Sequence, residues 1–394
     1  MTYQANVPIE KLAFKSSQDN SRIARWTPIQ DDFEILVEQG KEVVRRKDDT
    51  SFDKVSFELT PTYVNLPKDY APFSPFSDGG MLFHSGRFFA CASSCPADLN
   101  SWEMTLISID ADFIVVDGQN FMGRTSWIDR DDGQKIYLGS ATPQENMDIF
   151  ALIDSKLPPV LLKALERQIP EMMTFFASRL AKLEFKPTLF ASYSETSNGS
   201  FGHQGGTLPN QVFMHWYGKQ AISTINEYQV SWFFAHEIAH IFQREAKNIA
   251  AIEQQWIHEG GSEYMSYELL YKLGGNYRIY AEEKFKTSTS LCWKRTKTRN
   301  FGALIADQNY DLLYSCGLVF WHIIANDVNT LKVESNVFDI WAAFNSEVMK
   351  GEPSDFTTFL KVIEPIVSKE TFNTLRNIQK FRAADFVHLG GRAS

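Results

Sequence analysis

The residues most able to do chemistry lie in a short stretch, HEIAH, at positions 236 to 240. His236 and His240 are four residues apart, so on a helix both imidazoles lie on the same face, one turn apart. Two imidazoles at this spacing can bind one tetrahedral zinc ion at about 2.1 Å. Glu237 lies about 100° further round the helix, where its carboxylate can contact a metal-bound water but cannot join the histidines as a ligand in the same plane.

Chance does not explain this pattern well. With eight histidines among 394 residues, composition alone predicts on the order of 0.01 such matches in the chain. The surrounding segment, VSWFFAHEIAHIFQ, is apolar and predicts a buried helix over residues 227–245, with Thr224 and Glu227 as a capping box. Dry histidines and a carboxylate on such a helix carry a desolvation penalty unless they are partnered.

A catalytic zinc needs a third protein ligand, and the segment WIHEGGSEY offers Glu259, 18 residues after His240. That distance allows the first helix to end and a second helix to run back past the metal. Gly260 and Gly261 each cost a helix interior about 1 kcal/mol, and we expect their missing side chains to let the second helix approach the zinc helix closely. Glu263, one turn after Glu259, is expected to accept the free N–H of a ligating histidine.

The pattern of HEIAH, 18 residues and then Glu in a W-x-x-E-G-x-x-E-Y setting resembles the gluzincin zinc peptidases, and most closely the M1 aminopeptidase family. The resemblance implies that His236, His240 and Glu259 bind one Zn2+ per chain and that Glu237 is the general base. It therefore implies zinc-dependent hydrolysis of peptide substrates.

The resemblance extends downstream to YSCGLVFWHI, which is similar to an M1 segment where a tyrosine followed three residues later by a glycine opens a helix. It implies that Tyr314 stabilises the oxyanion and that Gly317 is the glycine. Taken alone, Tyr314 is more simply read as a half-buried core tyrosine. The order and distance of the match favour the functional reading.

The upstream match is imperfect. M1 aminopeptidases carry a G-x-M-E-N strand whose glutamate holds the free amine of the substrate. The segment GGTLPNQVF has Gly205, Gly206 and Asn210 in a similar setting, which makes them substrate-binding candidates. Leu208 cannot bind an ammonium group, so exopeptidase specificity stays open.

The hydrophobic pattern changes along the chain. Up to about residue 145 the apolar runs are short and strand-like, with turn signals at Asp117-Gly118 and at Asp132-Gly133, the second placed as in a hairpin. Later segments have helical spacing, with Pro159 near one helix start and Pro170 at the start of a second. The run NQVFMHWYG is expected to be an edge strand against which an extended peptide could pair.

These patterns predict an α+β multidomain protein. A mainly β, sandwich-like domain is expected over residues 1–145. The resemblance implies a thermolysin-like zincin catalytic domain over residues 146–394, α/β to about residue 245 and helical after it.

Composition excludes some functions. The net charge of -9 argues against nucleic-acid binding, which needs a basic face. No apolar run reaches the roughly 20 residues of a membrane span, and the longest candidate, residues 312–325, is expected to be a core helix. No secretory signal is visible, which favours the cytoplasm, whereas removal of a leader would fit a periplasmic or secreted protein. The oligomeric state is not readable.

The four cysteines are too few for a disulfide scaffold in a chain of this length. Cys91 and Cys95 could pair in an oxidising compartment, but buried thiols are the expected state.

The predicted function is peptide-bond hydrolysis of the M1 aminopeptidase type. Three alternatives remain: an endopeptidase, a zinc hydrolase of small substrates, and a non-catalytic, zinc-bound module that binds peptides.

Overall fold

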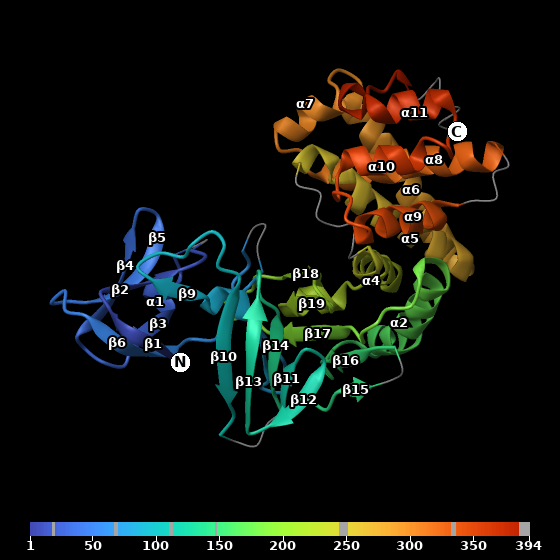
Figure 1. Cartoon of the computed structure of the whole chain (residues 1–394). Coiled ribbons are helices and arrows are strands. Elements are labelled where there is room, and N and C mark those ends of the chain that lie inside the picture. Colours follow the sequence, from blue (N-terminus) through green and yellow to red (C-terminus); the bar gives the residue numbers. More distant parts are fainter. Residues whose placement is uncertain are drawn as a thin grey trace. The chain divides into compact units, whose positions relative to one another are not determined.

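A computed structural model gives the fold (Figure 1). It describes residues 1–17, 20–66, 70–109, 113–145, 148–243, 251–331 and 336–385. Contacts divide the chain into a β unit, Met1–Pro158 with Lys186–Thr224, and a helical unit, Pro159–Phe185 with Ile225–Ser394. The predicted fold class, a mainly β N-terminal part followed by a helical C-terminal part, is confirmed. The domain boundary expected at residue 145 stays a prediction. The contacts group several strands after residue 145 with the β unit.

The β unit begins with a three-stranded and a four-stranded sheet, in the orders β1-β6-β3 and β4-β5-β2-β9. Their elements are β1 (Thr2–Ile9), β2 (Lys11–Phe14), α1 (Arg22–Arg25), β3 (Trp26–Pro28), β4 (Phe33–Glu38), β5 (Lys41–Arg46), β6 (Phe52–Leu59) and β9 (Ala90–Ala92). Buried side chains from both sheets, among them Phe14, Val44 and Phe57, form one core. This arrangement is typical of packed sheets that share an apolar layer.

A second group of strands follows, with a five-stranded sheet in the order β12-β11-β14-β8-β7 and a β10-β13 pair. Its elements are β7 (Phe73–Pro75), β8 (Met81–His84), η1 (Ser85–Phe88), β10 (Ser101–Ile107), β11 (Phe113–Val116), β12 (Gln119–Met122), β13 (Arg124–Arg130) and β14 (Lys135–Gly139). Asp117 and Gly118 form a two-residue hairpin turn, both with positive φ. The hairpin expected at Asp132-Gly133 is wrong, because β13 and β14 pair with strands of different sheets.

The last sheet of the β unit has the order β15-β16-β17-β19-β18. Its strands are β15 (Gln144–Glu145), β16 (Phe150–Ile153), β17 (Thr188–Ser194), β18 (Gly202–Leu208) and β19 (Gln211–Tyr217), followed by α3 (Lys219–Ser223). β19 pairs with β17 in parallel and with β18 in antiparallel orientation. The expectation that this run is an edge strand is therefore wrong, and the edge is formed by β18.

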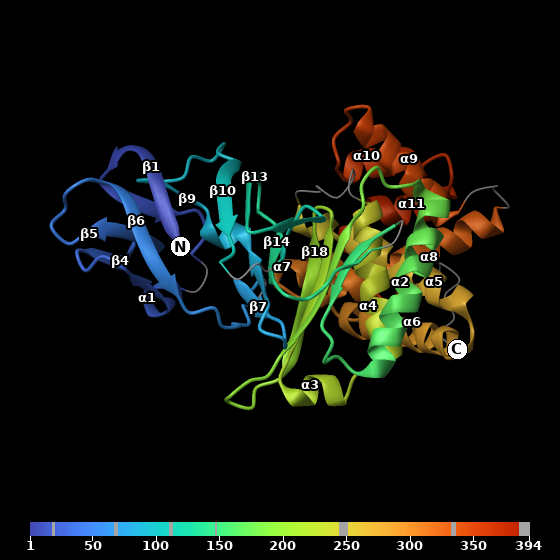
Figure 2. The same cartoon turned by 90° about the horizontal axis from the view of Figure 1, so that it is seen from below.

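The helical unit is built around α5, which contacts α4, α6 and α8 (Figure 2). Its helices are α2 (Pro159–Leu180), α4 (Glu227–Phe242), α5 (Trp256–Leu273), α6 (Gly275–Thr296), α7 (Phe301–Ala306), α8 (Asp311–Thr330), α9 (Val337–Met349), α10 (Phe356–Ile363) and α11 (Lys369–Arg376). Two short 3-10 turns, η2 (Ile252–Gln254) and η3 (Ile378–Lys380), complete it. No helix in the described ranges is long and apolar enough to cross a membrane.

Three helix boundaries differ from expectation. Pro170 lies inside α2 and does not begin a second helix; buried residues on both sides of it, such as Ile169 and Met173, continue one apolar stripe, so packing offsets the missing N–H. The cap of α4 is Asn226, which accepts from the backbone N–H of Tyr228 and Gln229, so the predicted capping box at Thr224 is wrong. The helix begins at residue 227, as predicted, and ends at Phe242; residues 244 and 245 lie outside the described residues.

The glycines of α5 pack against α8 and α9, whereas the expectation was that they would face the zinc helix. A Cβ on Gly260 would lie 2.4 Å from the backbone of Gly317 in α8, and a Cβ on Gly261 would lie 2.7 Å from the Trp341 ring in α9. The expectation was wrong because sequence spacing does not show which neighbour a bare backbone faces. The two backbones therefore meet where α5 contacts α8.

All four cysteines are paired, as Cys91–Cys95 and Cys292–Cys316, so the expected buried thiols are not found. The Cα–Cα distances, 5.1 and 5.0 Å, lie in the normal range for disulfides. Cys292 and Cys316 are brought together by the packing of α6 on α8, which the sequence spacing does not reveal.

Substituting Gly260→Ala should destabilise the helical unit. Alanine is the better helix former by about 1 kcal/mol, but its methyl group would meet backbone atoms that cannot rotate away. Overpacking of this kind typically costs about 1–3 kcal/mol, so we expect a net loss in the free energy of unfolding, measured by urea titration with tryptophan fluorescence. Glu283→Ala, at an exposed position in α6, is the control; equal stability of the two variants would contradict the close contact.

Candidate metal centre

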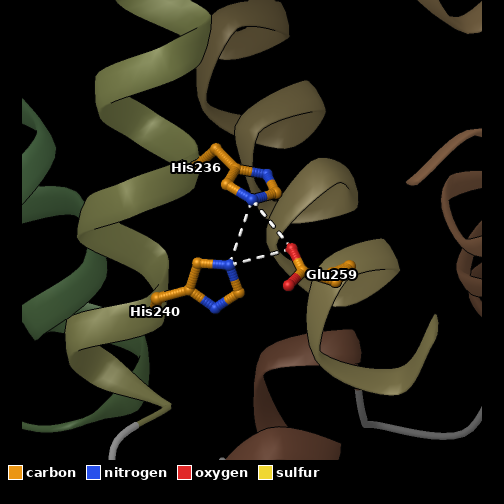
Figure 3. Close-up of side chains that lie close together, drawn as sticks. All are labelled: His236, His240 and Glu259. Atoms are coloured by element: carbon orange, nitrogen blue, oxygen red, sulfur yellow. Dashed lines mark hydrogen bonds and ion pairs between the residues drawn. The ribbon is translucent and has the colours of Figure 1, made fainter. Parts of the chain in front are cut away.

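Three side chains from two helices converge in the helical unit (Figure 3). His236 Nε2 and His240 Nε2, both on α4, are 3.0 Å apart. Each lies 3.2 Å from Oε2 of Glu259 on α5. The structure thus brings together the three residues that the sequence predicted as metal ligands, and their roles stay a prediction.

The donor set fits zinc. In a tetrahedral site with bonds of about 2.1 Å, ligand atoms lie about 3.4 Å apart, close to the 3.0 and 3.2 Å found here. Two imidazole nitrogens and one carboxylate oxygen are ligands that catalytic zinc takes in proteins, with a fourth position left for water or substrate. The three residues therefore suit a catalytic metal better than a closed structural one.

His236 is backed by a buried carboxylate. Its Nδ1 lies 3.1 Å from Oε1 of Glu263, and the support of a metal ligand by this glutamate stays a prediction. Trp232 Nε1 also donates to Glu263 Oε1, at 3.0 Å, and Lys284 Nζ lies 4.0 Å from Oε2. Carboxylate support of this kind fixes a ligating imidazole and raises its basicity.

The pKa values of these groups show strong mutual interaction. Burial alone lowers the pKa of His236, but hydrogen bonds to Glu259 and Glu263 outweigh it and raise the pKa overall. Burial alone raises the pKa of Glu259, but the charge of His240 and hydrogen bonds from both histidines hold it well below its usual range. The pKa of Glu263 is lowered in the same way, by His236 and Lys284 against the effect of burial. The negative charge that holds a proton on the imidazole would equally attract a divalent cation.

His240 has a different support, which the sequence analysis missed. Its Nδ1 lies 3.1 Å from Oε1 of Gln243 and 3.1 Å from Oγ of Ser262. Both partners are fully buried. The signal that could have found them is their periodicity, since Gln243 follows His240 by three residues and Ser262 follows Glu259 by three, which places each near the ligand on its own helix.

Tyr314 lies beside the cluster. Its ring stacks on that of His236, with centroids 5.6 Å apart and planes at 28°, and 40% of the residue is exposed. Burial raises the pKa of its hydroxyl well above the ordinary value, and the charges of Glu259 and Glu237 raise it further. The tyrosine therefore stays protonated and able to donate a hydrogen bond.

Glu237 is half-buried on α4, and its charge contributes to the raised pKa of both His236 and Tyr314. Its carboxylate thus acts electrostatically on the cluster although it is not one of the three grouped ligands. The role of Glu237 as general base stays a prediction.

The candidate substrate-binding residues belong to the β unit. Gly205 and Gly206 lie on β18, and Asn210 follows in a turn with φ 65°. Gly206 has a packing role, because a Cβ there would lie 3.0 Å from the Tyr70 ring. Substrate binding by these three residues stays a prediction.

Solved structures resemble this chain over nearly all its length. An M1 zinc metallopeptidase of Deinococcus radiodurans, a mutant bound to a Tyr-Ser-Ala substrate, gives a TM-score of 0.56 at 12% identity over 96% of this chain and 88% of that chain. An aminopeptidase N family protein of Idiomarina loihiensis gives a TM-score of 0.55 at 13% identity over 98% of this chain and 72% of that chain. Legionella pneumophila aminopeptidase A in complex with aspartic acid gives a TM-score of 0.55 at 10% identity, over 97% of this chain and 45% of that chain.

No family model and no curated protein matches the sequence. At these low identities the structural likeness defines the fold, which is that of M1 zinc metallopeptidases.

The purified protein should bind one zinc ion per chain, and His236→Ala or His240→Ala should weaken binding by more than about 100-fold, since loss of an outer-shell partner already costs about 10–100-fold. Equilibrium dialysis with elemental analysis measures both. His322→Ala, a half-buried histidine of α8 outside the cluster, is the matched control. Full zinc binding in a variant that lacks both His236 and His240 would contradict the assignment.

Proposed function

We propose that the protein is a zinc-dependent peptidase of the aminopeptidase type, and that His236, His240 and Glu259 hold the metal. The observation that carries this proposal is the convergence of these three ligand atoms within 3.2 Å of one another, with Tyr314 stacked beside them. The fold shared with M1 zinc metallopeptidases supports it.

Each residue of the chain has a separate task in this proposal. Zinc, when bound, supplies Lewis acidity for the attacking water and the scissile carbonyl. Glu237 accepts the proton of the water at its carboxylate and later delivers it to the leaving amine, which is general acid–base catalysis. Tyr314 donates a hydrogen bond to the oxyanion, a contact commonly worth about 3 kcal/mol of transition-state stabilisation.

One observation favours the endopeptidase alternative. Thr207, Leu208 and Pro209 stand where M1 aminopeptidases carry the Met and Glu of G-x-M-E-N, so this segment has no carboxylate for the substrate amine. Leu208 is 5% exposed in an apolar core with Phe76, Tyr137 and Phe213. A leucine in this setting offers the amine no partner. Any preference for free N-termini must then come from other groups.

The disulfides bear on the compartment. Such bonds persist mainly in oxidising surroundings, so Cys91–Cys95 and Cys292–Cys316 favour a periplasmic or secreted enzyme over the cytoplasmic one expected from the sequence.

Replacing Glu237 by Gln should leave zinc binding intact and lower turnover by about 10²–10⁴-fold, the usual contribution of general acid–base catalysis. The assay is cleavage of a mixed peptide pool followed by mass spectrometry, together with zinc analysis of the same sample. Gln220→Glu is the control, because it exchanges an amide for a carboxylate at an exposed position in α3. Unchanged turnover in Glu237→Gln would refute the mechanism, and a zinc-loaded wild-type protein that cleaves no peptide would favour the non-catalytic module.

Peptides with free N-termini should be hydrolysed faster than the same peptides with acetylated N-termini. Because Leu208 offers no carboxylate, we expect a ratio of kcat/KM of about 10–100, below the roughly 10⁴ given by a site built to bind a polar group. Matched pairs of fluorogenic peptides measure the ratio. Equal rates would show that the enzyme is an endopeptidase, while leaving the zinc chemistry unaffected.

A further inference from the structure

The two histidines of the cluster are supported unequally. His236 has a carboxylate behind it, that of Glu263, whereas the groups nearest to His240 Nδ1 are the amide of Gln243 and the hydroxyl of Ser262. Gln243 caps the C-terminus of α4 and Ser262 lies on α5. The two side chains also contact each other, with Ser262 Oγ 3.1 Å from Gln243 Oε1. They therefore link the two helices that carry the metal ligands.

The hydrogen-bond pattern assigns one proton arrangement. His240 Nε2 faces the other two ligand atoms, so a neutral imidazole that binds metal there carries its hydrogen on Nδ1 and needs an acceptor. Gln243 Oε1 is that acceptor. The amide is oriented by its other end, because Nε2 points to the carbonyl oxygen of His258 at 3.5 Å. Turning the amide over would place an N–H group against an N–H group.

We propose that Gln243 and Ser262 are positioning residues that hold His240 as the Nδ1–H tautomer with Nε2 directed at zinc. This inference rests on the proposed zinc site. Ser262 donates its hydroxyl hydrogen to Gln243 Oε1, so the amide oxygen accepts from both His240 and Ser262.

A neutral support has a physical reason here. Three carboxylates, those of Glu237, Glu259 and Glu263, already act on the cluster. A fourth negative charge is not needed to orient His240, since an amide oxygen accepts the same hydrogen bond. The pair thus fixes the direction of the imidazole without adding to the buried charge.

Two nearly isosteric substitutions separate the hydrogen bond from packing. Gln243→Met removes the acceptor and keeps the shape, so zinc affinity, measured by competition with a chromogenic chelator, should fall about 10–100-fold. Gln243→Glu keeps an acceptor oxygen, and its affinity should equal or exceed that of the wild type. If Gln243 acted by packing alone, Gln243→Met would keep the wild-type zinc affinity, and Gln243→Glu would lower it by burying a charge. A higher zinc affinity in Gln243→Met than in Gln243→Glu would therefore overturn the proposal.

A spectroscopic readout is independent of activity. In the zinc-loaded wild type, the Nδ1–H of His240 should give a slowly exchanging ¹H–¹⁵N signal, which is lost in Gln243→Met and kept in Gln243→Glu. If Gln243→Met fails to fold, as judged by circular dichroism, Ser262→Ala replaces it, with a smaller loss of affinity and faster exchange expected. Unchanged affinity and exchange in Ser262→Ala would overturn the role of the pair.

The outcomes distinguish this inference from the proposed function. A wild-type protein that binds no zinc refutes both. A wild type that binds zinc but cleaves no peptide refutes the peptidase proposal alone, because the chelator and NMR measurements still decide the role of Gln243.

Discussion

The backbone contact between Gly260 and Gly317 sets the geometry on which the candidate site depends. A Cβ on either glycine would lie within 2.6 Å of the other residue's backbone, so α5 and α8 meet backbone against backbone at this point. Glu259 directly precedes one glycine, and Tyr314 lies one turn before the other. Bringing the two backbones together therefore also brings Glu259, the third candidate metal ligand, to the helix that carries Tyr314, whose ring lies against His236. Close helix packing of this kind is rigid, because it contains no side chain that can adopt another rotamer.

Charge balance is the second constraint. Buried ions destabilise a protein unless partners replace the lost water, and here Glu259 and Glu263 are partnered by His236, His240 and Lys284. The close approach of like imidazole nitrogens, 3.0 Å between the two Nε2 atoms, would be unfavourable with both rings protonated. A divalent cation at that position would bind both nitrogens as acceptors and satisfy the carboxylate together with them.

Residue spacing along one helix correctly predicted which side chains share a face. The i, i+4 spacing of His236 and His240 and the turn between Glu259 and Glu263 fix which face each side chain shares, and the structure places them accordingly. Where the outcome depends on a partner distant in the chain, the sequence was insufficient. It could not show that Gly260 packs on α8, that the Cys292–Cys316 pair forms between two helices, or that β19 is flanked on both sides. Such contacts depend on tertiary packing, which local periodicity does not encode.

The departure from the M1 pattern over Thr207, Leu208 and Pro209 is a matter of strand geometry as well as residue type. Successive residues of a strand point to opposite faces, and on β18 both Gly206 and Leu208 are buried whereas Gly205 is only half-buried. A glutamate placed at 208 would therefore have its charge in an apolar core and could not serve there as an amine anchor. On the opposite face of β18, residue 203 is exposed and residues 205 and 207 are half-buried. Of the two glycines predicted to bind substrate, only Gly205 is on that face, and Gly206 is explained by its contact with Tyr70.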